Sequence, residues 1–336
     1  MKKYKKYILI VVSILIIFIT VFIIKIYSKN KDILLITTDK NLNINFYNYD
    51  GHETLDRILS FKKSTYHTGI EIGNKLFLNK KDNEKFTQLY EYDKSSKQEK
   101  QITDKNKFKI VNVDYMCKGK DKVFIRVLRD GHRNFNLASY DLNKKTINVY
   151  NEEDKDKSVH LFDYCEDTGT GIELVFSSKE YYENIKQANE NQTDLKNVQY
   201  SILYSKDCFE SNVEIGNISS KIVTSIDLSN KENKFIFTAK DSSESPTSIF
   251  EYNMNENTIT ELFNGDEHID LEKINNAKYS KDGKKIYFTA TKTNKEYQID
   301  YNGDEYKPNS LMSYDLMDKT IDTKLDLGSD TINYIN

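Results

Sequence analysis

The chain has 336 residues, a net charge of −3, and nearly equal numbers of basic and acidic side chains, 49 and 52. This balance gives no support to nucleic-acid binding or to attraction by an anionic membrane surface, so we expect no nucleic-acid partner. An odd, sparse set of three cysteines excludes a disulfide framework.

The first segment of the chain is strongly apolar. Residues 7–24 carry no charge, and the apolar run continues past Lys25 to Tyr27. About 18 to 20 uncharged residues suffice to cross a bilayer as a helix, and Lys25 can extend toward the head groups. Four lysines precede the run and three follow it, which favours a cytoplasmic N-terminus. We therefore expect residues 7–26 to be a transmembrane signal anchor of a single-pass cell-membrane protein.

A cleaved signal peptide is the alternative. Its apolar region would be shorter and would end in small residues, whereas this run ends in Phe-Ile-Ile-Lys-Ile-Tyr-Ser. No cysteine follows that could carry a lipid. The predicted organisation is thus a cytoplasmic tip and anchor over residues 1–32 and one extracytoplasmic domain over residues 33–336.

Beyond residue 33 the chain repeats a strand pattern. Residues 279–292 read YSKDGKKIYFTATK, in which a charged turn comes directly before an apolar run. Residues 229–240 have the same order, and residues 71–80 and 117–128 are weaker versions. Short runs of Ile, Val, Phe and Tyr between Asp-Gly, Asn-Gly or Lys-Asn turns are typical of antiparallel strands.

A second element of each unit is a Tyr followed by Asp or Asn. This Tyr recurs fifteen residues after an apolar strand residue in four units: Leu34 to Tyr49, Phe77 to Tyr92, Ile125 to Tyr140 and Phe237 to Tyr252. The interval from Phe288 to Tyr314 is longer by eleven residues, which the segment TKTNKEYQIDYNGDEYKPN supplies. A period of roughly 40 to 60 residues indicates a repeat architecture.

Four antiparallel strands per unit predict an all-β protein, a six-bladed β-propeller. Blade one begins at Ile33, and the others cover residues 64–103, 107–150, a degenerate fourth with a helical insertion near 178–197, 220–263 and 270–327. Blade one lacks a first strand, so we expect residues 331–335 to pair into it and close the ring. A two-domain sandwich is the alternative fold.

The residues that define the repeat are predicted to be structural. They are Ser280, Asp282, Gly283, Phe288, Phe237, Tyr92, Asp93, Tyr140, Asp141, Tyr252, Tyr314 and Asp315. Ser280, Asp282 and Gly283 could instead form a cation site, but a turn whose Asp caps its own backbone is the simpler interpretation. Phe237 and Phe288 are expected to be buried between blades.

The pattern S-x-D-G-K-K-I-x-F-T at residues 280–289 resembles the repeat of TolB-like β-propellers, also called WD40-like or PD40 propellers. The same repeat builds the propeller of prolyl oligopeptidase and dipeptidyl-peptidase-IV-type enzymes. The resemblance runs from about residue 33 to the end, and Lys281 stands where the family usually has Pro. In TolB proteins the propeller binds partner proteins in the cell envelope, and in the peptidases it gates a separate hydrolase domain. The resemblance therefore implies a fold and leaves the ligand open.

Motifs for chemistry are sparse. The peptidase motif G-x-S-x-G does not occur, and T-G-T-G at residues 168–171 is predicted to be a hairpin turn rather than a phosphate loop. The five histidines, His52, His67, His132, His160 and His268, show no ligand spacing, so we expect no metal or other cofactor. The acidic segments 264–272 and 299–309 are solvated loops or ligand loops. Cys165 and Cys208 could pair, although buried thiols are the simpler expectation.

Two functional classes remain. The first is a membrane-anchored module, not an enzyme, that binds or scaffolds a protein, peptide or glycan on a face of the propeller. The alternative is a surface enzyme of lyase or glycosidase type with its site at the mouth of the central channel. Paired carboxylates at that mouth would favour the enzyme, and a polar mouth without titratable pairs would favour binding.

Overall fold

The computed structural model describes residues 33–51, 54–62, 68–81, 86–119, 121–229, 231–240, 242, 245–268 and 270–336. The predicted anchor, residues 7–26, lies outside these residues. Within the described part of the chain, no helix is long and apolar enough to cross a membrane.

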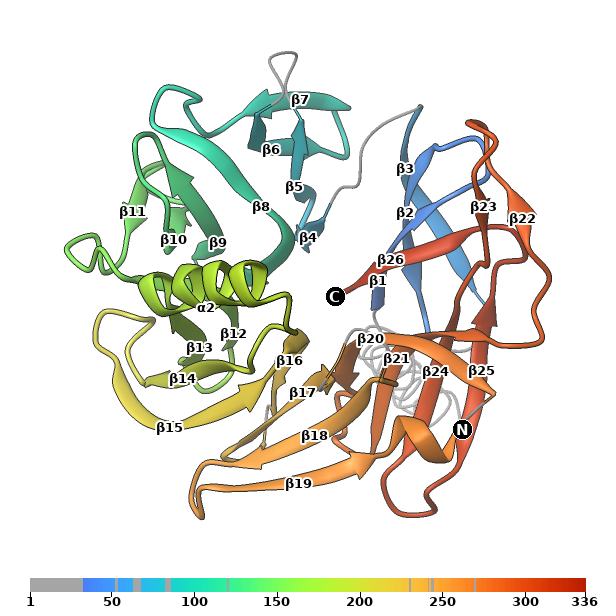
Figure 1. Cartoon of the computed structure of the whole chain (residues 1–336). Helices are drawn as coiled ribbons and strands as arrows, with labels where there is room; N and C mark the ends of the chain where they lie inside the picture. Colours follow the sequence, from blue (N-terminus) through green and yellow to red (C-terminus); the bar gives the residue numbers. More distant parts are fainter. Residues whose placement is uncertain are drawn as a thin grey trace, which may run out of the picture.

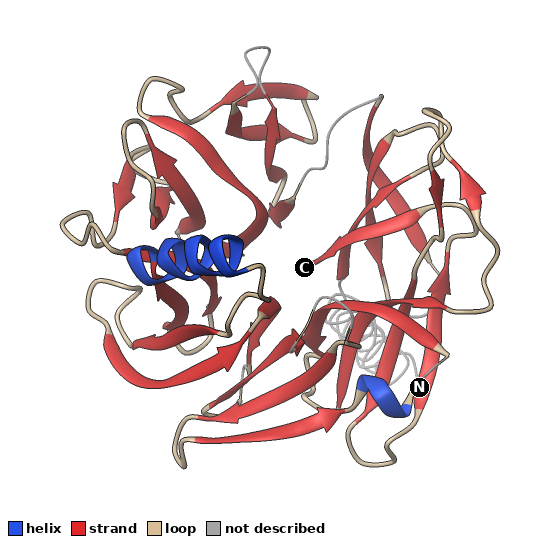
Figure 2. Ribbon diagram, viewed as in Figure 1, coloured by secondary structure: helices blue, strands red, loops and turns tan. Residues whose placement is uncertain are grey.

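The described chain is built almost entirely from antiparallel sheets arranged around a central axis (Figures 1 and 2). One four-stranded sheet has the order β26 (Thr331–Ile335), β1 (Ile33–Thr38), β2 (Ile44–Tyr49), β3 (Leu55–Phe61). A second sheet has the order β12 (Lys157–Cys165), β13 (Thr170–Ser177), β14 (Val198–Ser205), β15 (Val213–Ser220). A third has the order β16 (Ile222–Leu228), β17 (Lys234–Lys240), β18 (Ser248–Asn253), β19 (Thr258–Phe263). A fourth has the order β20 (Leu271–Tyr279), β21 (Lys285–Lys292), β24 (Ser310–Asp315), β25 (Ile321–Asp326). The predicted all-β propeller is confirmed.

The sequence predicts six separate four-stranded sheets, whereas the described residues form four of them. The strands expected for blades two and three lie in one eight-stranded sheet, made of β4 (Gly69–Ile72), β5 (Lys75–Lys81), β6 (Thr87–Asp93), β7 (Gln98–Gln101), β8 (Phe108–Lys118), β9 (Lys122–Arg129), β10 (Phe135–Asp141) and β11 (Ile147–Val149). Its two groups of four strands are joined by one parallel pair, Thr87 opposite Ile110. The join arises because β8 is eleven residues long and its first residues run beside β6.

The C-terminal strand closes the ring. β26 pairs antiparallel with β1, so that Leu35 lies opposite Ile335 and Thr38 opposite Thr331. Figure 1 shows β26 next to β1, with the C-terminus near the centre of the ring. We expected one sheet to hold both the strand that begins at Ile33 and the last strand of the chain. This closure is confirmed.

The charged turn at residues 280–285 is held by its own side chains. Ser280 Oγ donates to Asp282 Oδ1 (2.7 Å), and the backbone N–H of Lys284 donates to the same oxygen (3.1 Å). Gly283 has φ +70°, a conformation that costs glycine little. The turn is exposed, and its hydrogen bonds explain why Ser, Asp and Gly suit these positions.

The Tyr-Asp elements end the third strand of a unit and begin a hairpin turn. Asp141 Oδ1 accepts the N–H groups of Asn143 (2.9 Å) and Lys144 (2.7 Å). Asp93 and Asp315 each accept two N–H groups in the same way, and the fourth residue after each of these Asp residues has a φ of 57°. Tyr140, Tyr252 and Tyr314 are buried, whereas Tyr92 is half-buried. The Tyr thus packs in the core while the Asp caps the turn.

Two insertions interrupt the repeat. Helix α2 (Ser178–Asn191) joins β13 to β14, within the segment where a helical insertion was expected. Ser177 caps its first turn by accepting the N–H of Glu180 (3.1 Å). The eleven extra residues of the last unit fold as a two-stranded hairpin, β22 (Gln298–Ile299) and β23 (Glu305–Tyr306). A short 3₁₀ turn, η1 (Gly265–Glu267), lies in the acidic segment 264–272.

Candidate functional site

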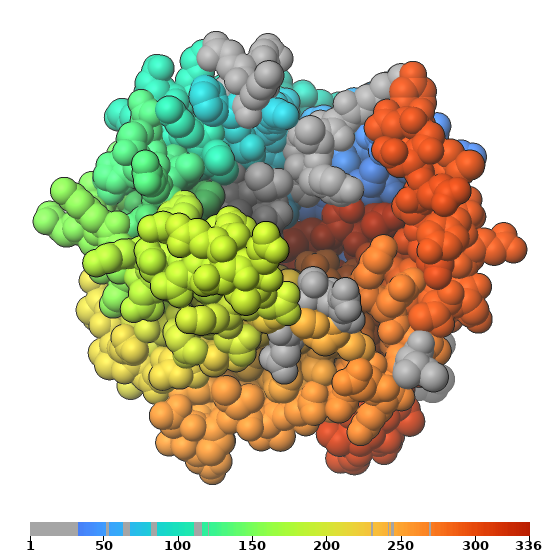
Figure 3. Space-filling model, in the orientation of Figure 1, coloured from blue at the N-terminus to red at the C-terminus, as the bar shows by residue number. Residues whose placement is uncertain are grey.

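The innermost strands end around a hollow of about 610 Å³. Five of its lining residues lie at or near the C-terminal ends of β4, β8, β12, β16 and β20; we call them the mouth ring: Glu71, Cys117, Asp163, Asp227 and Lys278. Each unit has four antiparallel strands, so the first strands of the units run in the same direction and their C-terminal ends share one face of the propeller. Helix α2 connects β13 to β14 and therefore lies on the opposite face, the one seen in Figure 3.

One charge pair of the mouth ring joins two neighbouring sheets. Lys278 Nζ lies 3.2 Å from Asp227 Oδ1, and the backbone N–H of Tyr279 donates to Asp227 Oδ2 at 2.7 Å. Burial raises the pKa of Asp227 to about 7, against the lowering effect of the Lys278 ammonium. Burial would lower the pKa of Lys278, but Asp227 and Asp163 outweigh it and hold that pKa well above its ordinary value. Lys278 therefore stays charged.

Asp163 forms an equivalent link one sheet earlier. Its Oδ2 accepts the backbone N–H of Leu228 at 2.6 Å, and the thiol of Cys117 donates to its Oδ1 at 3.1 Å. Burial, and then the charge of Asp163, raise the pKa of Cys117, so the thiol stays protonated. Each carboxylate thus binds the sheet that follows it, and hydrogen bonds to charged groups are worth about 1.5 to 3 kcal/mol each.

The outer rim of the mouth carries an exposed pair of opposite charges, in which Lys118 Nζ lies 3.0 Å from Glu166 Oε2. Glu71 of the mouth ring pairs with Lys94, and this pair is half-buried. Exposed pairs such as the first add little stability, about 0 to 1 kcal/mol. The mouth is therefore polar and mixed in charge, with its deep groups occupied by one another and its rim groups accessible.

No group of three or more His, Cys, Asp or Glu within the described residues could hold a metal ion. His160 is enclosed by Phe176 and Tyr200, His268 stacks on Phe263, and His132 lies at the surface; His52 and His67 are outside the described residues. Cys165 and Cys208 are free thiols, so the structure shows no bridge between them. Cys208 Sγ lies 2.9 Å from Tyr164 Oη instead.

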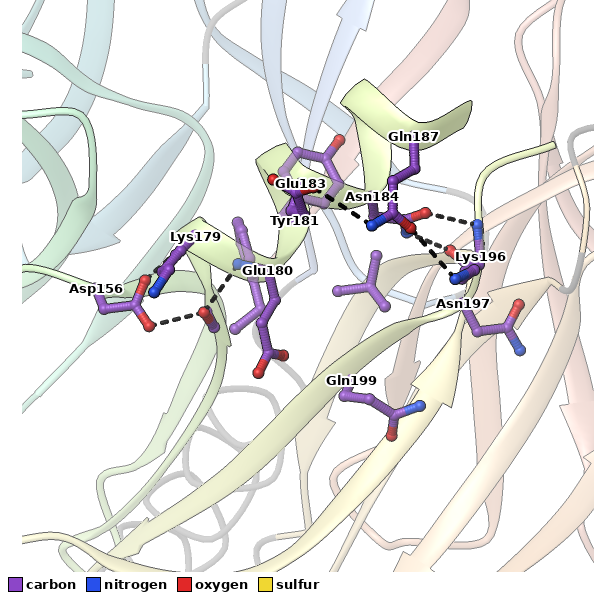
Figure 4. Close-up of a pocket in the computed structure, with 13 residues that line it drawn as sticks. Asp156, Lys179, Glu180, Tyr181, Glu183, Asn184, Gln187, Lys196, Asn197 and Gln199 are labelled. Atoms are coloured by element: carbon purple, nitrogen blue, oxygen red, sulfur yellow. Dashed lines mark hydrogen bonds between the residues drawn. The ribbon is translucent and has the colours of Figure 1, made fainter. Parts of the chain in front are cut away.

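A second hollow, of about 650 Å³, lies under α2 (Figure 4). Asn184 holds the loop that follows the helix, because its side chain accepts the N–H of Lys196 (3.1 Å) and donates to the carbonyl of the same residue (3.0 Å). Gln187 binds Glu183 and Lys196. These polar groups satisfy one another and hold the helix against the loop that leads into β14, so they stabilise the insertion itself.

The sequence motifs that might have carried chemistry are structural in this fold. T-G-T-G forms the turn between β12 and β13, where Gly169 has φ +71°. The repeat-defining residues lie in strands and turns, away from the mouth ring, except that Ser280 and Asp282 flank the lining residue Lys281. Sequence reasoning missed the mouth ring. The available signal was a charged residue near the end of each unit's first strand, as in FDYC and SIDLS.

A buried carboxyl in β13 also escaped notice. Glu173 is fully buried and accepts one hydrogen bond, from Asn212 Nδ2 at 2.7 Å. Its other oxygen, Oε2, has no hydrogen-bond partner among the described residues. Burial raises the pKa of Glu173 to about 7, against the lowering effect of Asn212.

We expect Glu173 to make stability fall as pH rises. A raised pKa in the folded state gives stability that is complete below the unfolded value, 4.5, and is lost as pH passes through about 7. The difference corresponds to about 3 kcal/mol. Urea denaturation at pH 5 and pH 8 should show this loss in the wild type, and Glu173→Gln should reduce it. The pKa of Asp227 lies in the same range, so the effect of Glu173 is the difference in pH dependence between the wild type and Glu173→Gln. Equal pH profiles of stability in the two proteins would show that Glu173 does not cause the loss.

Comparison with known proteins gives structural relatives only. No family model matches the sequence, and no curated protein matches it. TolB from Acinetobacter baumannii is 12% identical, with a TM-score of 0.58 over 91% of this chain and 67% of that one. A putative TolB from Agrobacterium tumefaciens is 9% identical, with a TM-score of 0.56 over 90% and 93%. An oligogalacturonate lyase in complex with manganese is 11% identical, with a TM-score of 0.51 over 87% and 84%.

These likenesses define the class of fold. The chain has the β-propeller fold of TolB proteins, as the S-x-D-G-K-K-I-x-F-T pattern led us to expect. The same fold occurs in a lyase, so the fold alone does not assign an activity.

Proposed function

We propose that this protein is a membrane-anchored, extracytoplasmic propeller that binds or scaffolds a protein, peptide or glycan of the cell envelope at the mouth of its channel. The observation that carries the proposal is the occupation of the deep charges: Asp163 and Asp227 bind backbone N–H groups of the next sheet, Cys117 and Lys278. Groups that are bonded in this way hold neighbouring sheets together, while the charged side chains of the rim are accessible to a partner.

The proposal includes a count of six blades. The two halves of the eight-stranded sheet share one residue pair, Thr87 with Ile110, whereas antiparallel strands within each half pair over several residues. Each half therefore acts as a blade in the ring. An experimental structure that showed continuous pairing between β6 and β8 would contradict this count.

The rim pair Lys118 and Glu166 provides the test of binding. A photo-crosslinking residue at Asp167, which lines the mouth, should capture a partner in cells that produce the full chain. The same residue at Ile259, exposed on the outermost strand β19, is the control. Replacing Lys118 and Glu166 by Gln should weaken capture from Asp167 several-fold without lowering the melting temperature, because exposed pairs stabilise little. Equal capture at both positions, or no effect of the rim variants, would contradict a site at the mouth.

One observation supports an enzyme as the second candidate. The pKa of Asp227 is raised to about 7, which suits a proton-transfer group in a cavity. Purified full-length protein should then cleave an anionic polysaccharide such as polygalacturonate, and Asp227→Asn should abolish the reaction while the protein stays folded. Absence of any new chain ends after prolonged incubation counts against the enzyme and leaves binding as the function.

The proposed orientation at the membrane is supported by the face at which β1 begins. β1 runs antiparallel to β26, so Ile33 lies at the face where β26 ends, and both Leu34 and Asn336 line the mouth. An anchor at residues 7–26 would therefore bring the mouth toward the membrane and turn α2 away from it. Protease added to intact cells should remove the propeller; protection until the cells are lysed would contradict an extracytoplasmic domain.

A further inference from the structure

The β22–β23 hairpin exposes an unusual amount of apolar surface. Tyr297, Ile299 and Tyr301 are 65%, 64% and 59% exposed, and they alternate along the first arm of the hairpin. Tyr297 and Ile299 alternate on the extended arm and therefore point to the same side, and Tyr301 follows at the start of the turn; we call the three residues the apolar stripe. Of the eight large apolar side chains that are exposed in the described part of the chain, three lie within these five residues. A concentrated patch of this kind marks an interaction site more often than scattered exposure does.

The same hairpin carries an excess of negative charge. Glu296, Asp300, Asp304 and Glu305 lie on it, and none of the four forms a salt bridge with a described residue. Its two lysines are neutralised by acids outside the hairpin: Lys295 lies 2.7 Å from Asp326, and Lys307 lies 3.3 Å from Glu272. The hairpin therefore presents acidic groups around an apolar stripe.

Further carboxylates lie at the base of the hairpin. A hollow of about 250 Å³ there is lined by Asp39 and Asp300, together with Lys273 and Lys307. Burial and the negative charge of Asp39 raise the pKa of nearby Asp330, as expected where carboxylates gather. The hollow is large enough for a long side chain, and its two aspartates and two lysines leave it balanced in charge.

The hairpin is also held in place. The backbone N–H of Tyr301 donates to the carbonyl of Lys40 in the β1–β2 turn (2.8 Å), and Tyr306 Oη donates to the carbonyl of Ser329 (2.7 Å). These bonds tie an insertion of one blade to the strands that close the ring. A docking surface fixed in this way loses little conformational entropy when it binds.

We propose that the β22–β23 hairpin is a second docking surface, for a segment of a partner protein that is rich in Lys or Arg and carries apolar side chains. The apolar residues of the partner would cover the stripe, and its cations would meet the four carboxylates. Anionic lipids and anionic polymers are disfavoured by the same charges. Because the hairpin connects β21 to β24, it lies on the face opposite the mouth, so this surface is independent of the function proposed above.

Binding to defined peptides tests the chemistry. Two synthetic peptides of equal length, one alternating Lys with Leu and one alternating Glu with Leu, would be titrated into the purified full chain. We expect the Lys peptide to bind at least about tenfold more tightly, and added salt to weaken it. The triple variant Glu296→Gln, Asp304→Gln, Glu305→Gln should remove this preference, and Ile299→Ser should weaken binding of the Lys peptide. Ile259→Ser, which alters another exposed isoleucine, on β19, is the control and should bind like the wild type.

Crosslinking in cells tests the natural occupant. A photo-crosslinking residue at Ile299 should yield an adduct whose attached segment, identified by mass spectrometry, has an excess of Lys and Arg, while the same residue at Ile259 should not. The proposal is overturned by equal affinity for the two peptides, by unchanged binding in Ile299→Ser, by an acidic or neutral attached segment, or by an adduct with a second copy of this chain. If the Gln variants of Lys118 and Glu166 lose the adduct at Asp167 but keep the adduct at Ile299, the two surfaces bind independently.

Discussion

Removal of residues 329–336 is expected to unfold the propeller. The deletion takes away β26, whose Ile332, Tyr334 and Ile335 are buried, and exposes the edge of β1. It also removes the bonds between Asn309 and the backbone of Ile332, at 2.7 and 2.8 Å. Three buried side chains at about 1.5 to 3 kcal/mol each, with the lost backbone pairing, amount to a loss on the order of 5 to 10 kcal/mol. That is comparable to the whole stability of a typical domain.

The measurement is urea denaturation of the full chain with and without the last eight residues, together with the fraction that aggregates. An exposed strand edge should increase aggregation as well as lower the midpoint. The double substitution Ser329→Ala, Asp330→Ala is the matched control, because it alters the deleted segment while leaving β26 paired. An unchanged midpoint in the truncated protein, or rapid amide exchange at Ile332 and Tyr334 in the parent, would show that β26 does not close the ring.

Phe288→Ala and Phe237→Ala should each cost about 3 to 5 kcal/mol, because each opens a cavity in the core. Phe288 is fully buried in β21, and its ring centroid lies 5.5 Å from that of Phe263. Phe237 is 2% exposed in β17 and stacks on Phe250, with ring centroids 5.3 Å apart. Their surroundings are rigid strands, which cannot easily collapse into the space that is left.

The controls for these variants separate packing from a general effect of substitution. Phe→Leu at either position should cost less than Phe→Ala, since it leaves a smaller cavity. Ile259→Ala, at an exposed position on an outermost strand, should change the unfolding free energy by about 0.5 kcal/mol or less. If Phe288→Ala or Phe237→Ala denatures like the parent, the strand that carries it is not part of the core.

Local features of this protein could be predicted from its sequence because they depend on residues that are close along the chain. Asp93, Asp141 and Asp315 cap turns through backbone groups two and three residues away, so the turns recur with the sequence. The spacing between strand and Tyr-Asp reflects a hairpin of nearly constant length. A spare strand at the end and a missing one at the start were enough to predict closure, which the pairing of β26 with β1 confirms.

The candidate site could not be predicted in this way, because its residues meet only when the ring is closed. Asp163 reaches Leu228 and Asp227 reaches Tyr279 across about fifty to sixty-five residues of chain. The burial that raises the pKa of Glu173 and Asp227 comes from packed neighbours, and no local pattern records it. The join between β6 and β8 likewise depends on where a long strand happens to run. The sequence by itself determined the strands, their turns and their repetition, because these follow from local hydrogen bonding and from the alternation of apolar and polar residues. The tertiary structure alone decided which charges share the mouth, because that depends on contacts between distant strands.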